Sequence, residues 1–315
     1  MEKEDFTALA LEVFHFQYGN NPVYRLYTDT LGIRPASVRT VTEIPFLPVS
    51  FFKTHTIRTT DFEPAIVFES SGTTGTGGSR HEVRDPGLYK KSFTAGFERF
   101  YGPVQDWCII GLLPSYLERS HSSLVLMVHD LIALSGHPDS GFYLYEHDRL
   151  AGLLRRLEAQ GQKTLLIGVT FALLDFAEQH TLQLRHTVVM ETGGMKGRRK
   201  EMTRAELHGF LTQRMGLPVI QAEYGMTELL SQAYSYGNGR FQSPPWMKAL
   251  IRTEDDPLEV RTAGEGILNI IDLANLYSCS FLATEDIGRL YDDGSFEVSG
   301  RVDNSDIRGC SLLVV

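Results

Sequence analysis

The stretch TLLIGVTFALLDFAEQHTLQLRHTVVMETGG, residues 164–194, contains two apolar runs separated by a helix-like segment. The run 164–170 is mostly apolar and the run 186–192 has an apolar centre, VVM; apolar runs of this kind are typical of strands that are buried on both faces of a parallel sheet. The intervening segment 171–180 is predicted to be helical. A buried strand, a helix and a second buried strand together predict a β–α–β unit.

The same alternation continues on both sides of this unit. It is carried by the apolar run 107–114, the helical segments 147–161 and 203–216, and the strand-like run 218–228. Two helix starts have capping signals, because Asp85 precedes Pro86 and Thr203 precedes Glu206 by three residues. We therefore expect a layered α/β core with parallel-rich sheets over residues 1–255.

The sequence pattern changes after about residue 255. Strand-like runs separated by turns dominate, as in EVRTAGEGILNIID (259–272) and CSFLATEDIGRL (279–290). This pattern predicts a β-rich C-terminal subdomain over residues 256–315, ending in a mobile tail that carries Cys310.

Composition narrows the class of protein. The 315 residues are 42% hydrophobic and 22% charged, and the net charge of −9 does not favour a nucleic-acid-binding surface. Three cysteines form neither a disulfide framework nor a metal knuckle. The start lacks a signal-peptide pattern, and the most apolar run, 122–136, is too short to span a bilayer. We expect a cytoplasmic enzyme without a membrane span.

A glycine–threonine loop, SSGTTGTGGSRH (70–81), follows a short β-type run. Its backbone N–H groups and hydroxyls could cradle a phosphate, with Arg80 as a nearby cation. A Walker loop is excluded because Gly78 stands where that motif needs lysine. The alternative is a mobile surface loop. The candidate phosphate-binding residues are Ser70, Ser71, Gly72, Thr73, Thr74, Gly75 and Arg80.

Two later constellations carry polar residues at strand ends. EYGMTE (223–228) places Glu228 where a carboxylate could bind Mg²⁺ together with a triphosphate. TEDIGR (284–289) and GRVD (300–303) supply Asp286 for ribose hydroxyls and Arg301 for ribose or phosphate. Alone, these residues could equally be solvated charges and hairpin turns. His81, His121 and His129 are expected to be structural or surface groups.

The order of these motifs resembles that of the adenylate-forming enzymes, which include acyl-CoA synthetases, luciferases and nonribosomal adenylation domains. Several segments are similar to one branch, the acyl-protein synthetases of LuxE type. They are IPFLPVSFFK (44–53), LLPSYLERSHSSLVLMV (112–128), GVTFALLDF (168–176), ETGGMKGRRKEMTRAELH (191–208), EYGMTELLSQAYS (223–235) and GRVDNSDIRGCSL (300–312). The resemblance covers roughly residues 44–313.

This resemblance implies ATP and Mg²⁺ as cofactors, a carboxylic or fatty acid as substrate, and the large N-terminal domain fold of these enzymes without their small C-terminal lid domain. It implies that residues 70–75 hold the ATP phosphates and that the adenine lies against Gly193, Gly194 and the segment before the YGMTE run. Tyr224 is implied to stack on the base, Thr227 to contact phosphate and Glu228 to coordinate Mg²⁺. Asp286 and Arg301 are implied to contact the ribose. Glu223, Gly225 and Met226 are implied to lie in the nucleotide site.

The resemblance also implies that Cys310 accepts the acyl group and passes it to an acyl reductase or an acyl-carrier protein. A thiol is a strong nucleophile near neutral pH, and Arg308, two residues before Cys310, would favour its thiolate form. Two alternatives stay open. One is a ligase of phenylacetate–CoA type that uses coenzyme A or a carrier protein. The other is a catalytically degenerate nucleotide-binding scaffold, since the loop and the GRVD segment lack the family's usual lysines.

Overall fold

The computed structural model of the protein describes residues 3–70, 78–113, 121–193 and 202–302. Its helices are α1 (Lys3–Asn20), α2 (Pro22–Thr30), α3 (Phe51–Thr54), α4 (Pro86–Tyr101), α5 (Ser123–Ser135), α6 (His147–Gln160), α7 (Thr170–Gln179) and α8 (Arg204–Met215), with short 3-10 turns at Pro35–Ser37 and Val104–Asp106. In these described ranges, no helix combines the length and the apolar character needed to cross a membrane.

The strands form one large mixed sheet and one hairpin. They are β1 (Leu47–Pro48), β2 (Ile66–Glu69), β3 (Arg80–Val83), β4 (Cys108–Leu112), β5 (Gly141–Phe142), β6 (Thr164–Val169), β7 (Thr187–Thr192), β8 (Gln221–Tyr224), β9 (Ala233–Ser235), β10 (Arg240–Gln242), β11 (Met247–Arg252), β12 (Val260–Arg261), β13 (Gly264–Asp272), β14 (Phe281–Leu290) and β15 (Phe296–Arg301). The large sheet has the order β12-β11-β13-β14-β15-β10-β9-β8-β7-β6-β4-β5, and β1 pairs with β14.

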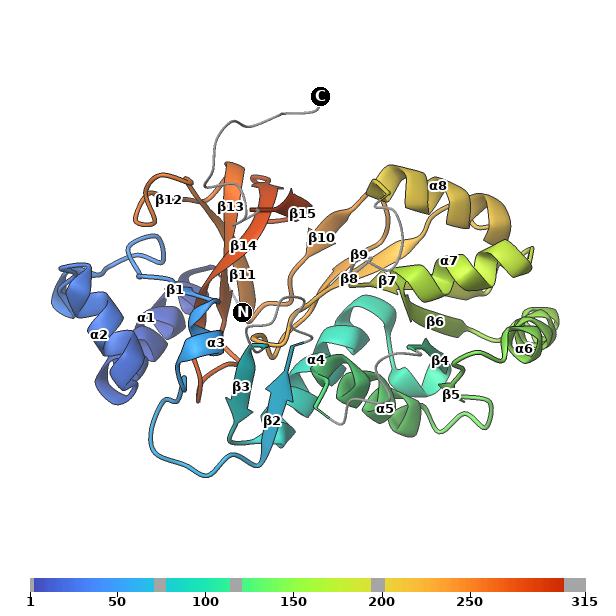
Figure 1. Ribbon diagram of the computed structural model, residues 1–315, viewed down its shortest axis with the longest axis horizontal. Coiled ribbons are helices and arrows are strands. Elements are labelled where there is room, and N and C mark those ends of the chain that lie inside the picture. Colours follow the sequence, from blue (N-terminus) through green and yellow to red (C-terminus); the bar gives the residue numbers. More distant parts are fainter. Residues whose placement is uncertain (1–2, 71–77, 114–120, 194–201, 303–315) are drawn as a thin grey trace.

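One half of the large sheet is parallel, as the alternating sequence pattern predicts. Strands β8, β7, β6, β4 and β5 pair in parallel. Helices α4 and α5 lie on one side of these strands and α7 and α8 on the other (Figure 1). Because both faces are covered, every residue of β4 and β6 is buried. The expected α/β class with a parallel-rich sheet is confirmed.

Both predicted helix starts are confirmed. The Asp85 side chain accepts a hydrogen bond from the Gly87 N–H at 2.8 Å, and Pro86 is the first residue of α4. Thr203 and Glu206 form a reciprocal capping box at the start of α8. Each cap satisfies backbone N–H groups that have no partner within their own helix.

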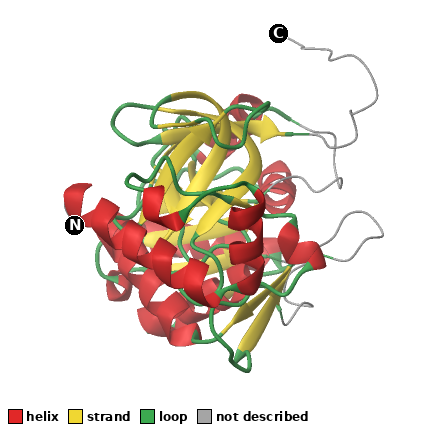
Figure 2. Ribbon diagram, turned by 90° about the vertical axis from the view of Figure 1, so that its left-hand side faces the viewer, coloured by secondary structure: helices red, strands yellow, loops and turns green. Residues whose placement is uncertain are grey.

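The other half of the sheet is antiparallel, which agrees with the strand-rich pattern of the C-terminal sequence. The pairs formed among β9 to β15 are antiparallel, whereas the short β1 pairs in parallel with β14. β8 joins the two halves because it pairs parallel with β7 and antiparallel with β9. Helices α1 and α2 cover this half, which lies behind them in Figure 2. Phe14 and Tyr24 pack on Phe281 of β14, with ring centroids 6.0–6.2 Å apart. The domain boundary at residue 255 stays a prediction.

Candidate functional site

The hairpin β2–β3 carries the glycine–threonine loop. The Ser70 N–H donates to the Ser79 carbonyl at 3.0 Å, and the Ser79 N–H donates to Ser70 Oγ at 2.8 Å, so the base of the loop is closed. A Cβ at Gly78 would overlap the Ser70 carbonyl, which explains glycine where a Walker loop has lysine. Arg80 Nε lies 3.5 Å from Glu69 Oε1, in an exposed pair.

Several predicted site residues lie outside the described residues. They are Ser71, Gly72, Thr73, Thr74, Gly75, Gly194 and Cys310. Their predicted roles stay predictions. The described site is therefore built from the hairpin base and from the strand ends that face it.

Three predicted site residues meet at the Asp286 carboxylate. The Tyr224 hydroxyl, at the end of β8, donates to Asp286 Oδ2 at 2.7 Å. Arg301 of β15 donates from Nε to Asp286 Oδ1 at 3.0 Å. Asp286 is only 6% exposed, yet each of its oxygens keeps a second lone pair that could accept a ligand hydroxyl. The cluster thus joins residues up to 77 positions apart in the chain, from Tyr224 to Arg301.

The Tyr224 ring is fixed in the core. It packs against Phe241 and Phe296, with ring centroids 5.8 and 5.3 Å away. Burial, reinforced by the negative charge of Asp286, raises the pKa of Tyr224 well above its ordinary value. Its hydroxyl is therefore a permanent donor to Asp286 at neutral pH. Stacking of Tyr224 on a nucleotide base stays a prediction.

Glu228 lies between the base of the hairpin and the Asp286 cluster. Burial raises the pKa of its carboxyl, and four interactions oppose this effect: hydrogen bonds from the Ser79 hydroxyl and from the Glu228 backbone, and the positive charges of Arg301 and Lys53. Sequence reasoning missed Lys53 of α3, because nothing in the chain links it to a glutamate 175 positions later. Lys53 places a second cation near this carboxylate.

Binding of a metal ion beside Glu228 would depend on ligands from the nucleotide. Within the described ranges, no group of three or more His, Cys, Asp and Glu side chains is arranged to hold a metal ion. Mg²⁺ commonly takes one or two protein carboxylates and completes its shell with phosphate oxygens and water. Glu228 fits that pattern as a single protein ligand.

A second carboxylate, Glu223, is buried at the carboxyl end of β8. Burial raises its pKa to about 7, the nearby charge of Glu191 adds to this effect, and a hydrogen bond from Thr192 Oγ1 opposes it. A Cβ at Gly225 would collide with Glu223 Oε1, so the close approach of this side chain requires the glycine of the YGMTE run. Glu223 is therefore partly protonated near neutral pH.

Glu191, at the end of β7, organises a cluster that sequence reasoning did not single out. Arg204 Nε and His208 Nε2, both on α8, lie 3.5 and 3.4 Å from Glu191 Oε1. Thr170 Oγ1 lies 3.1 Å from Glu191 Oε2 and 2.7 Å from the Gly193 carbonyl. The helical spacing of Arg204 and His208 was the available signal, since residues four apart share one face.

Two predicted site residues, Met226 and Thr227, and two cysteines complete the description of the site candidates. Met226 and Thr227 are half-buried in the loop after β8, and the Thr227 carbonyl lies 2.8 Å from His81 Nδ1. Cys108 and Cys279 are buried, and burial raises the pKa of their thiols to about 11 and about 12. Neither thiol is therefore activated as a nucleophile.

A curated relative is similar to the chain over nearly its whole length. No family model matches the chain. The long-chain-fatty-acid–luciferin-component ligase of Vibrio harveyi is 22% identical over 350 aligned positions, which include 99% of this chain and 87% of the relative.

Solved structures share the fold. ATP-bound MatB from Rhodopseudomonas palustris is 18% identical with a TM-score of 0.56, over 77% of this chain and 50% of MatB. The luciferase-like enzyme of the mealworm Zophobas morio is 18% identical with a TM-score of 0.52, over 80% of this chain and 61% of that enzyme. The AMP complex of O-succinylbenzoate coenzyme A synthetase from Bacillus subtilis is 16% identical, with a TM-score of 0.51, over 78% and 50% of the two chains.

The chain spans about half the length of the first of these structures. The resemblance that the ordered motifs predict is confirmed: the protein has the fold of the adenylate-forming enzymes and resembles, along nearly its whole length, the acyl-protein synthetases of LuxE type.

Proposed function

We propose that the protein is a cytoplasmic ligase that activates a fatty acid with ATP and transfers the acyl group through Cys310 to a partner. The observation that carries the proposal is the meeting of Tyr224 and Arg301 on Asp286, beside Glu228 and the base of the glycine–threonine hairpin. These groups lie where β8 ends, and ligands of α/β sheets bind at the carboxyl ends of parallel strands. The similarity to a fatty-acid ligase supports the choice of substrate.

In the first step, a carboxylate oxygen of the acid attacks the α-phosphorus of ATP, and the bond to pyrophosphate breaks. Asp286 accepts hydrogen bonds from the ribose hydroxyls, while Arg301 and Lys53 balance negative charge on the phosphates. Such positioning and charge stabilisation are the main contributions that a protein makes to phosphoryl and nucleotidyl transfer. When bound, Mg²⁺ supplies further positive charge to the phosphate oxygens, and Glu228 is the described residue that would hold it.

In the second step, the Cys310 thiolate attacks the acyl carbonyl of the adenylate, forming a thioester and releasing AMP. The acyl group then passes to the nucleophile of an acyl reductase or an acyl-carrier protein. The buried thiols of Cys108 and Cys279 are poor candidates for this role, because their raised pKa values keep them protonated.

Intact-mass spectrometry tests the second step. After incubation with MgATP and a panel of fatty and aromatic acids, we expect an acyl adduct that neutral hydroxylamine removes and that maps to the Cys310 peptide. Cys310→Ser should abolish the adduct and keep acid-dependent ATP–pyrophosphate exchange. Cys108→Ala is the matched control and should keep both.

Three results would contradict the proposal in different ways. An adduct that persists in Cys310→Ser would move acylation to another residue. Release of an acyl-coenzyme A thioester by Cys310→Ser at the wild-type rate would favour the phenylacetate–CoA type of ligase. Absence of exchange with every acid would support the degenerate nucleotide-binding scaffold.

A further inference from the structure

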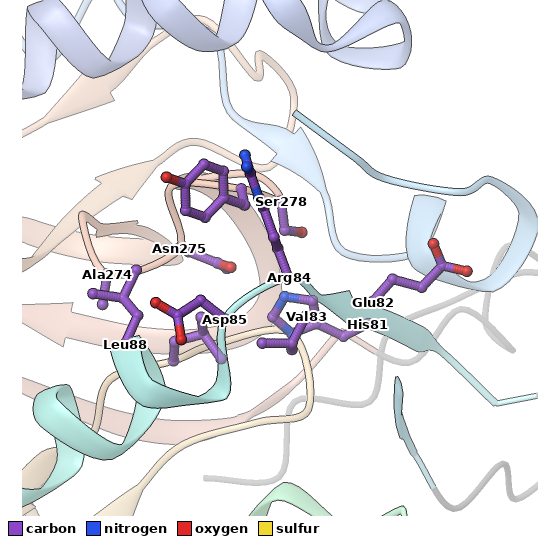
Figure 3. Close-up of a pocket in the computed structure, with 11 residues that line it drawn as sticks. His81, Glu82, Val83, Arg84, Asp85, Leu88, Ala274, Asn275 and Ser278 are labelled. Atoms are coloured by element: carbon purple, nitrogen blue, oxygen red, sulfur yellow. The ribbon is translucent and has the colours of Figure 1, made fainter. Parts of the chain in front are cut away.

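A small cavity lies behind the hairpin, between β3, the first turn of α4 and the turns that join β13 to β14 (Figure 3). Its volume is about 10 Å³, which is at the lower limit of the space that a single water molecule needs. Apolar side chains, including Val83, Leu88 and Leu230, form part of its wall. Figure 3 also shows His81, Asn275 and Ser278 around the same cavity.

Three polar atoms of these cavity residues lack partners. They are His81 Nε2, Asn275 Oδ1 and Ser278 Oγ, and none has a hydrogen-bond partner among the described residues. The three residues are 0%, 1% and 2% exposed, so bulk water does not reach them. Buried polar atoms in native proteins nearly always have a partner, and leaving three together unpaired would be costly.

The other polar atoms of His81 and Asn275 are committed to the YGMTE run. His81 Nδ1 lies 2.8 Å from the Thr227 carbonyl, which can only accept, so Nδ1 carries the proton. Asn275 Nδ2 donates to the Glu228 carbonyl at 2.6 Å. His81 Nε2 and Asn275 Oδ1 are then both acceptors, and two acceptors cannot bond to each other.

The charge state of His81 agrees with this assignment. Burial lowers the pKa of His81 to about 4, although the Thr227 carbonyl and the Asn275 side chain favour the protonated ring. The ring is thus neutral at pH 7 and carries one proton. A group that donates two hydrogens is needed to satisfy both acceptors.

We propose that one water molecule occupies this cavity, donates to His81 Nε2 and Asn275 Oδ1, and accepts from Ser278 Oγ, so that His81 and Asn275 are positioning residues for Thr227 and Glu228. This water would satisfy all three unpaired atoms at once. It would also connect β3, which follows the glycine–threonine loop, with the turns after β13.

The consequence for activity rests on the proposed function. The carbonyls of Thr227 and Glu228 are consecutive, and one is held from β3 and the other from Asn275. Their side chains are the ones expected to contact phosphate and Mg²⁺. Fixing this backbone therefore fixes both groups relative to the loop that would hold ATP, and misplacement by about 1 Å can cost on the order of 100-fold in rate.

The water and the tautomer are tested on the wild-type protein without an activity assay. In ¹⁵N spectra of histidine-labelled protein at pH 7, we expect a ring with the proton on Nδ1 whose signal disappears in His81→Asn. A proton on Nε2 of His81 would overturn the proposal. So would a high-resolution crystal structure with no water within hydrogen-bond distance of His81 Nε2 and Asn275 Oδ1.

The positioning role is tested by a pair of substitutions. His81→Asn places an amide donor where Nδ1 stands, whereas His81→Phe removes it. We expect kcat for ATP–pyrophosphate exchange to fall on the order of 10- to 100-fold in His81→Phe, with most of the rate restored in His81→Asn. Tyr24→Phe, which loses a buried hydrogen bond to the Pro45 carbonyl beneath α2, is the control and should keep kcat.

Two kinetic results separate the possible failures. Equal loss of kcat in His81→Phe and His81→Asn would overturn the positioning role. Absence of exchange in the wild type would count against the proposed function, while the tautomer and the water would still be decided by the spectra and the crystal structure.

Discussion

Replacing Glu223 with glutamine should change how the free energy of unfolding depends on pH. Glutamine has nearly the shape of glutamate and keeps an oxygen that can accept the hydrogen bond from Thr192. It does not titrate. The substitution therefore removes one buried ionisable group and leaves the packing at the end of β8 almost unchanged.

The sign follows from the raised pKa. Burial takes the Glu223 pKa from its ordinary value of 4.5 to about 7. Between these two values the folded protein holds a proton that the unfolded chain has released. The stability that this carboxyl contributes is complete below pH 4.5 and is lost as pH rises through about 7. The difference between 4.5 and 7 corresponds to a loss of about 3 kcal/mol for the full titration.

Urea unfolding of both proteins at pH 5 and pH 8.5 measures this loss. Most of this loss falls between these two pH values, so Glu223→Gln should gain roughly 2–3 kcal/mol relative to the wild type. His81, whose pKa burial lowers, contributes the opposite slope because its neutral form is favoured in the fold. Both proteins contain His81, so its contribution cancels in the difference.

Asp272→Asn is the matched comparison. Burial raises the pKa of Asp272 from 3.8 to about 6, against hydrogen bonds from Leu230, Ser231 and Ala274. Its pH-dependent difference from the wild type should therefore be complete by about pH 7, earlier than that of Glu223→Gln. A difference between the wild type and Glu223→Gln that is equal at pH 5 and pH 8.5 would refute the assigned pKa.

Three further predictions concern the nucleotide site and one helix. Asp286→Asn should raise the KM for ATP in the exchange assay about 10- to 100-fold, since hydrogen bonds to charged groups contribute about 1.5–3 kcal/mol; an unchanged KM would exclude a ribose contact. Lys53→Met should lower exchange activity while Lys53→Arg keeps most of it, and equal activity in both would remove Lys53 from the site. Thr203→Ala should lose about 1 kcal/mol of unfolding free energy through the broken capping box, measured by urea titration, with no change in KM.

The parts of the fold that depend on local sequence were predictable. Apolar runs identify β4 and β6, and a short apolar centre identifies β7, because strands covered on both faces do not alternate polar and apolar residues regularly. The caps at Asp85 and Thr203 were predictable because each acts within three residues of its own position. The order of the motifs predicted the superfamily, since several weak signals in a fixed order are more specific than any one of them.

Contacts between distant segments were not predictable. His81 meets the Thr227 carbonyl 146 residues away, and Asn275 meets the Glu228 carbonyl 47 residues away. Neither pair has a spacing that a helix or a hairpin would impose. The sequence indicated only that His81 is a structural or surface group, because its burial and its partner depend on how β3 packs against the loop after β8. Such side chains are found only when the tertiary structure is known.

The junction at β8 explains why the candidate site combines residues from both halves of the sheet. Backbone hydrogen bonding continues from β8 through β9, β10 and β15 to β14. Tyr224 and Asp286 are thus related by paired strands, and a group held on strands keeps its geometry better than one held on loops. On the other side of β8, parallel pairing with β7 places Thr192 opposite Glu223. The YGMTE run begins at the end of β8, which pairs with β7 on one side and with β9 on the other. The position of this run therefore depends on both pairings.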